Sequence, residues 1–533
     1  MTAVANWGLK DVKAAFEKEV IYKQFTKYKA LELINYKDIE PNAVRLRSQM
    51  LYKKKVNGTI SGRLPADGSS QPPDSYIDTY AATSDQTNAN ALYSTIPRDC
   101  ANRGTEGKVV LGHFDVPAAF INNLPLTKDK TGGRQVVMRL PLDLPDASLA
   151  GRWVQVKMCI YGMKQSNHEF DKSLNEFLSS LGYKALPSDT RLYIKRAPDK
   201  TLLAIRVHVD DGGFISDNPD LIDELEAALK ARYGDDVSFS RNSDGVCSVR
   251  FTRLSNGDLK LDCGPYIRKQ LAKWGMDNVP PALTPSLPGL FTTPADDVLL
   301  DPAGKHDFQV VTGTMVFPLA VRGDVALEVN YLCSRNQNPT VGDRKKQIQV
   351  QRYLKAFPDE GPVFSAKPGP IELVGTSDAS HAVHMDGSSH TGHTLSIGHD
   401  NAPFAVTSVA ERSSVSPDAM SAEYKSLGRL AKKTIYYRQI LRELGYPQST
   451  PSTLETDSQS SINLAIAPQI TRKSRHIFIQ HHFIRSLVKH GHVKPVHVGT
   501  NDMMSDMLTK QLSTNKFFYG RSRLFNTLFT TSP

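Results

Sequence analysis

Paired cysteines are missing from this chain. Its five cysteines are scattered over 533 residues, and none forms a Cys-x-x-Cys pair. The scattering excludes a zinc ribbon, argues against a disulfide framework and is typical of a protein in a reducing compartment.

Long hydrophobic runs are missing as well. No stretch of about 18 apolar residues occurs, as a membrane span would need, and residues 1–10 contain no apolar segment of the signal-peptide kind. We therefore expect an intracellular protein, cytoplasmic or nuclear or both, that is not secreted and has no membrane partner. The hydrophobic content of 40% and charged content of 23% are those of a globular protein with two or three domains.

Acidic residues are absent from two stretches of a chain whose net charge is +10. No Asp or Glu lies between Glu40 and Asp67 or between Asp457 and Asp502, and residues 471–494 contain six Lys/Arg and five His. Such stretches suit a polyanionic partner, because Lys and Arg neutralise phosphates and release counterions. Two ordinary solvated faces are the alternative.

Among the features that are present, two adjacent aspartates stand out, Asp210 and Asp211. Apolar and polar residues alternate before them, as in a half-buried strand, and the following Asp-Gly offers a tight turn. Adjacent carboxylates repel each other unless a cation lies between them. The pattern therefore indicates either a divalent-metal site or a solvated hairpin.

A second group of acids follows the proline-rich segment 280–302, which we interpret as a linker. Asp378 is expected at a strand end, Glu423 in the first turn of a helix over 422–444, Asp457 at the end of strand 453–457, and Asp506 early in the last helix. Carboxylates so placed can converge on two metal ions that hydrolyse a phosphodiester. Helix caps or surface positions are the alternative.

Eight motifs, in order, resemble the reverse transcriptase–ribonuclease H portion of a copia-type LTR retrotransposon polyprotein. The resemblance covers residues 30–515. The motifs lie at residues 114–120, 160–165, 209–211, 377–379, 422–424, 456–459, 475–485 and 505–510.

The resemblance implies an α+β fold, a right-hand polymerase followed by a ribonuclease H-like α/β domain with a mixed five-stranded sheet. The implied domains are an N-terminal lead-in with fingers and palm over 1–262, a thumb and proline-rich linker over 263–305, a connection over 306–370, the ribonuclease H-like domain over 371–515 and a tail over 516–533. No protease, integrase or zinc-knuckle motif is visible, so we expect a fragment or product of a larger polyprotein, or a truncated copy.

The implied activity is RNA- and DNA-directed DNA synthesis with ribonuclease H cleavage of RNA–DNA hybrids. Its cofactor would be Mg²⁺ or Mn²⁺. The partners would be an RNA template, a DNA primer, the hybrid, dNTPs and other parts of a retroelement polyprotein.

The resemblance also assigns residue roles. Metal-binding catalytic residues would be Asp115, Asp210 and Asp211, with the Val116 carbonyl as a further ligand, and separately Asp378, Glu423, Asp457 and Asp506. Phe120 would exclude a ribose 2′-OH, with a plain core aromatic as the alternative. The other nucleotide- or template-binding residues would be Arg63, Tyr161, Gly162, Lys164 and Gln165. The nucleic-acid-binding residues would be Arg472, Lys473, Arg475, His476 and Arg485.

Some positions depart from the family pattern. His208 replaces a tyrosine, Pro117 replaces a polar residue, residues 167–169 replace a Pro/Arg/aromatic segment, and His381 replaces a tryptophan. These changes leave two alternatives: a decayed remnant that binds nucleic acid, or a nuclease with a silent polymerase half.

Two histidine groups suggest zinc, but neither contains a paired cysteine or the helical His pair with Glu of a zinc hydrolase. We expect exposed loop residues in the first group and nucleic-acid contacts or packing in the second. The groups are His381, His384, His390, His393 and His399, and then His476, His481, His482, His490 and His492.

Overall fold

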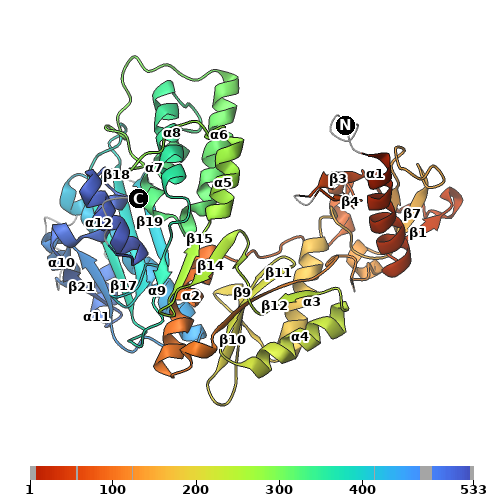
Figure 1. Ribbon diagram of the computed structural model, residues 1–533, viewed down its shortest axis with the longest axis horizontal. Helices are drawn as coiled ribbons and strands as arrows, with labels where there is room; N and C mark the ends of the chain where they lie inside the picture. Colours follow the sequence, from red (N-terminus) through yellow and green to blue (C-terminus); the bar gives the residue numbers. More distant parts are fainter. Residues whose placement is uncertain (1–7, 56–57, 123, 413–414, 468–482, 529–533) are drawn as a thin grey trace.

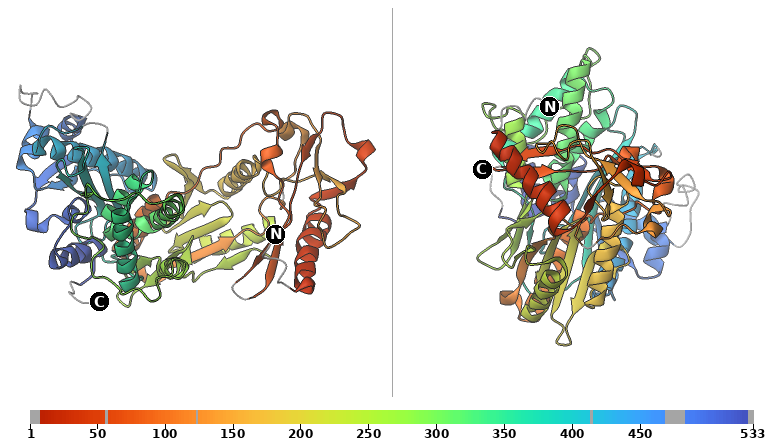
Figure 2. Two further views of the ribbon diagram at one scale, coloured as in Figure 1. Left: turned by 90° about the horizontal axis from the view of Figure 1, so that it is seen from above. Right: turned by 90° about the vertical axis from the view of Figure 1, so that its right-hand side faces the viewer.

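The structure is a computed structural model that describes residues 8–55, 58–122, 124–412, 415–467 and 483–528. The molecule is elongated, with the N-terminal part at one end, the C-terminal part at the other and a six-stranded sheet between them (Figure 1; Figure 2).

The N-terminal end contains a small four-stranded sheet of order β1-β7-β6-β2, flanked by helix α1 and the π-helix η2. An antiparallel pair, β3 and β4, projects beside α1 and pairs Lys54 with Ile60. Residues 56 and 57 of its turn lie outside the described ranges. The bounds are α1 Leu9–Phe16, η2 Glu17–Lys27, β1 Leu31–Ile34, β2 Val44–Leu46, β3 Leu51–Lys54, β4 Ile60–Arg63, β6 Val136–Arg139 and β7 Trp153–Val156.

The central sheet has the order β12-β5-β11-β10-β9-β8. Alternate residues of its strands, such as Leu203, Ile205 and Val207, enter one apolar cluster with helices α3 and α4. Helices α3 and α4 therefore cover one face of the sheet. The strand residues that alternate with these apolar residues point to the other face. The bounds are β5 Val110–Asp115, α3 Ser166–Ser180, β8 Lys184–Leu186, β9 Asp189–Arg196, β10 Leu202–His208, β11 Asp211–Ser216, α4 Pro219–Tyr233 and β12 Ser238–Ser240.

A second four-stranded sheet, of order β13-β14-β15-β16, leads into four helices that pack together. The proline-rich segment carries no helix until Pro302 opens α6, as predicted. The predicted boundary at residue 305 falls inside α6. The bounds are β13 Gly245–Val246, β14 Val249–Arg253, β15 Leu259–Asp262, α5 Gly264–Lys273, α6 Pro302–Val316, α7 Ala326–Arg335, α8 Val341–Ala356 and β16 Val363–Phe364.

The C-terminal part is built on a five-stranded mixed sheet of order β19-β18-β17-β20-β21, in which β17, β20 and β21 are parallel. Helix α9 packs on β17, where an added Cβ at Gly375 would meet Leu430 of α9 at 2.8 Å. The bounds are β17 Leu373–Ser380, β18 Ser389–Ile397, β19 Ala405–Glu411, α9 Ala419–Glu443, β20 Ser452–Thr456, α10 Gln459–Ile466, α11 Phe483–Lys489 and β21 Val493–His497.

Helix α12, Thr514–Phe525, occupies most of the segment predicted as a tail. Phe517, Phe518 and Phe525 are buried, and the Arg521 guanidinium lies 4.2 Å from the ring centre of Phe357. Helix α12 is therefore part of the core, because Phe517 packs against Tyr353 of α8 and Phe518 against Phe357, which follows α8.

Helix α2, Gln86–Asn102, bridges the central and C-terminal sheets. Asn88 donates one hydrogen bond of 2.9 Å to Asp189 and another of 3.0 Å to Tyr436 of α9. Arg98 is fully buried and donates a 2.6 Å bond to Asp400. Helix α2 therefore links the central sheet to the C-terminal part.

No helix in the described ranges is long and apolar enough to cross a membrane.

Candidate active sites

Two of the predicted polymerase acids lie side by side on the central sheet. Asp115 ends β5 and pairs with Asp211, which begins β11; His208 of β10 also pairs with Asp211. Directly opposed residues of antiparallel strands project to the same face, so these three side chains share one face of the sheet. That face is opposite to α3 and α4.

The third acid, Asp210, lies in the turn. The turn is Val209-Asp210, closed by the His208–Asp211 pair, and not the Asp-Gly turn that was predicted. Val209 has φ of 60°, a left-handed conformation that strains a β-branched residue. The Asp210 carbonyl accepts a 3.2 Å hydrogen bond from the amide of Val116, which ties the turn to the end of β5.

The charges of these acids are unequal. Burial, together with the neighbouring aspartates, raises the pKa of Asp115 and of Asp210 above the ordinary value. The pKa of Asp211 is lowered, first by a hydrogen bond from His113, whose Nε2 lies 3.4 Å from Oδ1 of Asp211. The sequence interpretation missed His113, although its position two residues before Asp115 places it on the same strand face.

Three of the predicted nucleotide-binding residues are stacked beside the acids. The Arg63 guanidinium lies 5.0 Å from the ring centre of Tyr161, and that ring lies edge-on to Phe120 at 4.9 Å. Phe120 is buried in the cluster shared with α3. Arg63 favours the ionised form of Asp210 electrostatically, so the stack borders the carboxylates.

The remaining predicted residues of this group fix a neighbouring loop. Gly162 has φ of 88°, and a Cβ there would lie 2.0 Å from the Ala66 carbonyl, so only glycine fits. Lys164 Nζ donates to the Gln71 carbonyl at 3.1 Å, and Gln71 donates to the buried Gln165 at 2.7 Å. Lys164 and Gln165 therefore hold the segment around Gln71 in this structure.

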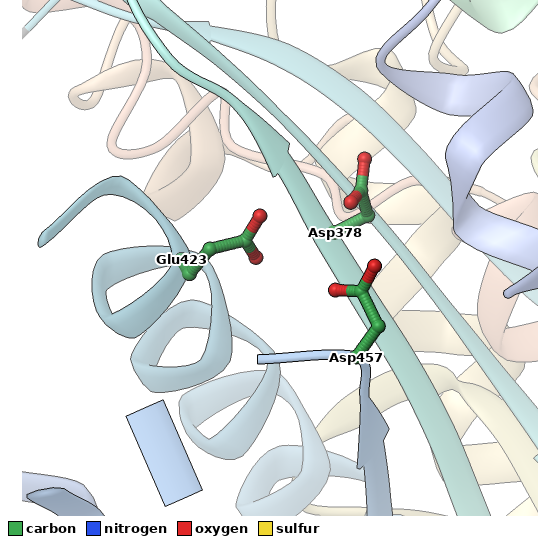
Figure 3. A group of neighbouring side chains, drawn as sticks. All are labelled: Asp378, Glu423 and Asp457. Atoms are coloured by element: carbon green, nitrogen blue, oxygen red, sulfur yellow. The ribbon is translucent and has the colours of Figure 1, made fainter. Parts of the chain in front are cut away.

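Three of the four predicted hydrolytic acids converge. Asp378 lies inside β17, Glu423 in the second turn of α9, and Asp457 just after β20. Each offers a carboxylate oxygen, and these oxygens all lie within 4.8 Å of one another. Figure 3 shows the three carboxylates turned toward one another from three different elements. Among the described residues, this is the only such group of three or more His, Cys, Asp or Glu side chains.

Burial and mutual repulsion raise the pKa of two acids in this cluster. Burial first, and then Asp378 and Asp457, raise the pKa of Glu423 to about 9. Burial also raises the pKa of Asp378 to about 6, against the opposing effect of Lys510. Oxygen Oε2 of Glu423 is buried and has no hydrogen-bond partner. Neighbouring carboxylates repel one another when ionised, and the buried Oε2 of Glu423 lacks a hydrogen bond. A divalent cation would offset both unfavourable effects, so the cluster fits such a cation.

Asp506 stands beside this group in the 3₁₀ turn η13, Met504–Leu508, and not in the last helix as predicted. Lys510, which the sequence interpretation did not assign, donates 3.2 Å and 3.0 Å bonds to Asp378 and Asp506. Thr509 also donates to Asp378. Lys510 follows Asp506 by four residues, and that spacing within the quoted motif was the available signal.

Most of the predicted nucleic-acid-binding residues cannot be placed. Arg472, Lys473, Arg475 and His476 lie outside the described residues, and so do His481 and His482. Arg485 is in α11 and donates to the Ala467 carbonyl at 3.1 Å.

The prediction that the first histidine group is exposed is wrong for three of its members. His384, His390 and His393 are buried, and the last two lie in β18. Their polarity suggested a loop, but the sheet pairs their backbone and provides a polar partner for His390.

The chain is similar to known reverse transcriptases. Residues 35–288 match the family of the reverse transcriptase (RNA-dependent DNA polymerase). The retrovirus-related Pol polyproteins from transposons RE1 and RE2 of Arabidopsis thaliana are each 26% identical to it, over 88% and 90% of this chain but 31% and 32% of the relatives. The chain thus spans about a third of the length of these curated relatives.

The fold is also that of a solved reverse transcriptase. The foamy viral protease-reverse transcriptase in complex with double-stranded DNA superposes with a TM-score of 0.53 at 12% identity, over 92% of this chain and 70% of that one. The predicted fold, a polymerase followed by a ribonuclease H-like domain, is confirmed. Residues 35–288 thus resemble a reverse transcriptase region, and the chain as a whole is similar to copia-type retrotransposon Pol polyproteins.

Proposed function

We propose that this protein synthesises DNA on RNA and DNA templates and cleaves the RNA strand of the resulting hybrid. One observation supports it: the acids of the two implied sites gather at two separate places in one chain. Asp115 and Asp211 are paired on the central sheet, and Asp378, Glu423 and Asp457 form the cluster on the C-terminal sheet.

The partners in this proposal are an RNA template, a DNA primer, their hybrid and dNTPs. In the palm, Asp115, Asp210 and Asp211, with the Val116 carbonyl, would hold Mg²⁺ or Mn²⁺. Bound cations would lower the pKa of the attacking oxygen and neutralise the departing one. Arg63 would meet the phosphates of the incoming nucleotide, because its guanidinium is exposed and lies over Tyr161 beside Asp210.

In the second site, Asp378, Glu423, Asp457 and Asp506 would hold the cations for hydrolysis. Lys510 keeps the buried Asp378 neutralised between turnovers and aligns Asp506 with it. Arg485, with the basic residues 472–476, would contact the nucleic-acid backbone.

The test is primer extension on an RNA template in Mg²⁺, with hybrid cleavage measured in the same tube. Asp210→Asn with Asp211→Asn should lower extension by about 100-fold or more and leave cleavage intact. Asp457→Asn should do the reverse. Asp235→Asn, which makes the same single charge change as Asp457→Asn at an exposed position, is its matched control.

A second candidate function is a nuclease with a silent polymerase half. Its support is that the three palm aspartates are not gathered as closely as the acids of the second site, and that His208 and Pro117 depart from the family pattern. Cleavage without extension would favour it. A folded sample with neither activity would leave a remnant that binds nucleic acid.

A further inference from the structure

A chain of hydrogen bonds runs through the C-terminal sheet beneath the segment that carries Asp506. Nε2 of His384 lies 2.9 Å from Nδ1 of His390, and Nε2 of His390 lies 2.7 Å from the Ser408 hydroxyl. That hydroxyl donates a 2.7 Å bond to the Leu508 carbonyl. His384, His390 and Ser408 are all buried.

In this relay, which runs from His384 through His390 and Ser408 to Leu508, the donor and the acceptor of every hydrogen bond are fixed. A carbonyl only accepts, so the one proton of Ser408 goes to Leu508, and its oxygen must accept from Nε2–H of His390. Burial lowers the pKa of His390 to about 3, so this imidazole is neutral and carries one N–H. Its Nδ1 therefore accepts from Nε2–H of His384, and the relay fits together in one arrangement only.

The end of the relay lies next to groups that touch a catalytic carboxylate. Thr509 and Lys510 directly follow Leu508, and both donate to Asp378. The segment lies very close to the sheet, since a Cβ at Gly392 would meet the Leu508 Cβ at 2.6 Å. A second tie, from Ser505 to Thr376 at 3.0 Å, holds the other end of the segment.

We propose that Ser408 and His390 are positioning residues for the hydrolytic site: they fix the Leu508 carbonyl and thereby set Asp506, Thr509 and Lys510 against Asp378. This inference rests on the proposed hydrolytic function. A hydroxyl backed by an imidazole is suited to the task, because neither partner can turn away without leaving a buried polar group unpaired.

The outer end of the relay contacts the proline-rich segment. The ring of Phe291 lies edge-on to His384, with 4.7 Å between ring centres. Segment 280–302 therefore stabilises the same arrangement from outside the C-terminal sheet.

Removing the Ser408 hydroxyl tests the proposal. Partners that orient metal-binding groups typically contribute about 10-fold or more to metal affinity. Ser408→Ala should therefore raise the Mg²⁺ concentration for half-maximal hybrid cleavage about 10-fold, whereas Ser408→Thr, which keeps a hydroxyl, should stay close to wild type. Primer extension in the same tube reports whether the polymerase half is intact.

Metal binding provides a readout apart from activity. In an Asp115→Asn/Asp210→Asn/Asp211→Asn background, which removes all three palm acids, Mn²⁺ binding followed by electron paramagnetic resonance should weaken about 10-fold with Ser408→Ala. Ser396→Ala is the matched control, because Ser396 is a buried serine on β18 that donates to the Gly398 carbonyl at 2.9 Å. It should leave Mn²⁺ affinity unchanged.

A second pair of variants applies if Ser408→Ala does not fold. His390→Gln can both accept and donate, and should keep Mn²⁺ affinity, whereas His390→Leu should lose it. Wild-type affinity in Ser408→Ala or His390→Leu, or an equal loss in Ser396→Ala, would overturn the proposal. A wild-type chain that neither cleaves hybrid nor binds Mn²⁺ at this site would instead overturn the proposed function.

Discussion

The hydroxyl of Ser188 donates a 2.8 Å hydrogen bond to Oε1 of Glu443, and the Ser188 amide donates a 3.0 Å bond to Oε2 of the same carboxylate. Ser188 lies between β8 and β9 of the central sheet, and Glu443 ends α9 of the C-terminal part. Next to this contact, Arg196 donates to the Leu444 carbonyl at 2.8 Å. The polymerase half and the ribonuclease H-like domain are therefore in direct contact.

Glu443→Ala should weaken this contact and lower the free energy of unfolding by about 1–3 kcal/mol, since hydrogen bonds to a charged group contribute about that much. Ser188→Ala should cost less in the Glu443→Ala background than in wild type, because the hydroxyl has then already lost its partner. Urea unfolding of both single variants and the double variant measures this coupling. Strictly additive costs would show that the contact does not stabilise the protein.

The pH dependence of stability should reveal Glu328 of α7. Glu328 accepts a hydrogen bond from Ser286, its Oε2 is buried without a partner, and burial raises its pKa from 4.5 to about 7. The folded state holds this proton more tightly than the unfolded state, so the stabilisation is complete below about pH 4.5 and is lost as the pH rises through about 7.

Between about pH 4.5 and 7, Glu328 alone should lower the free energy of unfolding of the wild-type protein by about 3 kcal/mol. Glu328→Gln keeps an oxygen for Ser286 but does not titrate, so its stability should fall less steeply. Unfolding free energies measured from pH 4 to 8 test this. Parallel curves for the two proteins would contradict it.

The strand before Asp210 could be predicted from sequence because apolar and polar residues alternate there, and it is β10 of the central sheet. The turn could not. Asp-Gly is a strong turn signal, but the register pairs His208 with Asp211 and places Val209 at positive φ. Such strain is stabilised by tertiary contacts, and local propensity does not encode it.

Helix α2 and the buried histidines were unpredictable for a different reason. Helix α2 is rich in Asn, Ala, Ser and Thr and is buried on nearly all sides, so it has no apolar stripe of helical period. His390 is polar, and its hydrogen bonds to His384 and Ser408 make burial favourable. All four predicted hydrolytic acids were expected together, and three of them, Asp378, Glu423 and Asp457, are together. The contact of Asp506 with Lys510 depends on the close packing of η13 on the sheet.

Phe120 should decide nucleotide selectivity if it borders the incoming sugar. It is 7% exposed and lies against both Tyr161 and Phe170. Phe120→Val should raise ribonucleotide incorporation relative to deoxynucleotide incorporation about 10-fold or more, since the lost ring would leave space for a 2′-OH. Steady-state kinetics with paired rNTP and dNTP measure this.

Phe170→Val is the control for Phe120, because it loosens the same cluster from the α3 side. Equal loss of stability in the two variants with unchanged selectivity would mean that Phe120 is an ordinary core aromatic.

Lys510 should stabilise the protein in the absence of metal. Its Nζ lies between Asp378, whose side chain is fully buried, and Asp506. Lys510→Met leaves a buried carboxylate beside a second acid, but Lys510 is itself 38% exposed and partly screened by solvent. The free energy of unfolding should therefore fall by about 2 kcal/mol in EDTA.

Added Mg²⁺ should recover much of this loss, since a divalent cation neutralises the same carboxylates. Lys516→Met, at an exposed position of α12, is the matched control and should change little in either condition. If Lys510→Met were as stable as wild type in EDTA, Asp378 would have to be protonated in the metal-free protein at the pH of the measurement. Because Lys510 lowers the pKa of Asp378, its removal raises that pKa above about 6, so the difference in stability between Lys510→Met and wild type should grow as the pH rises.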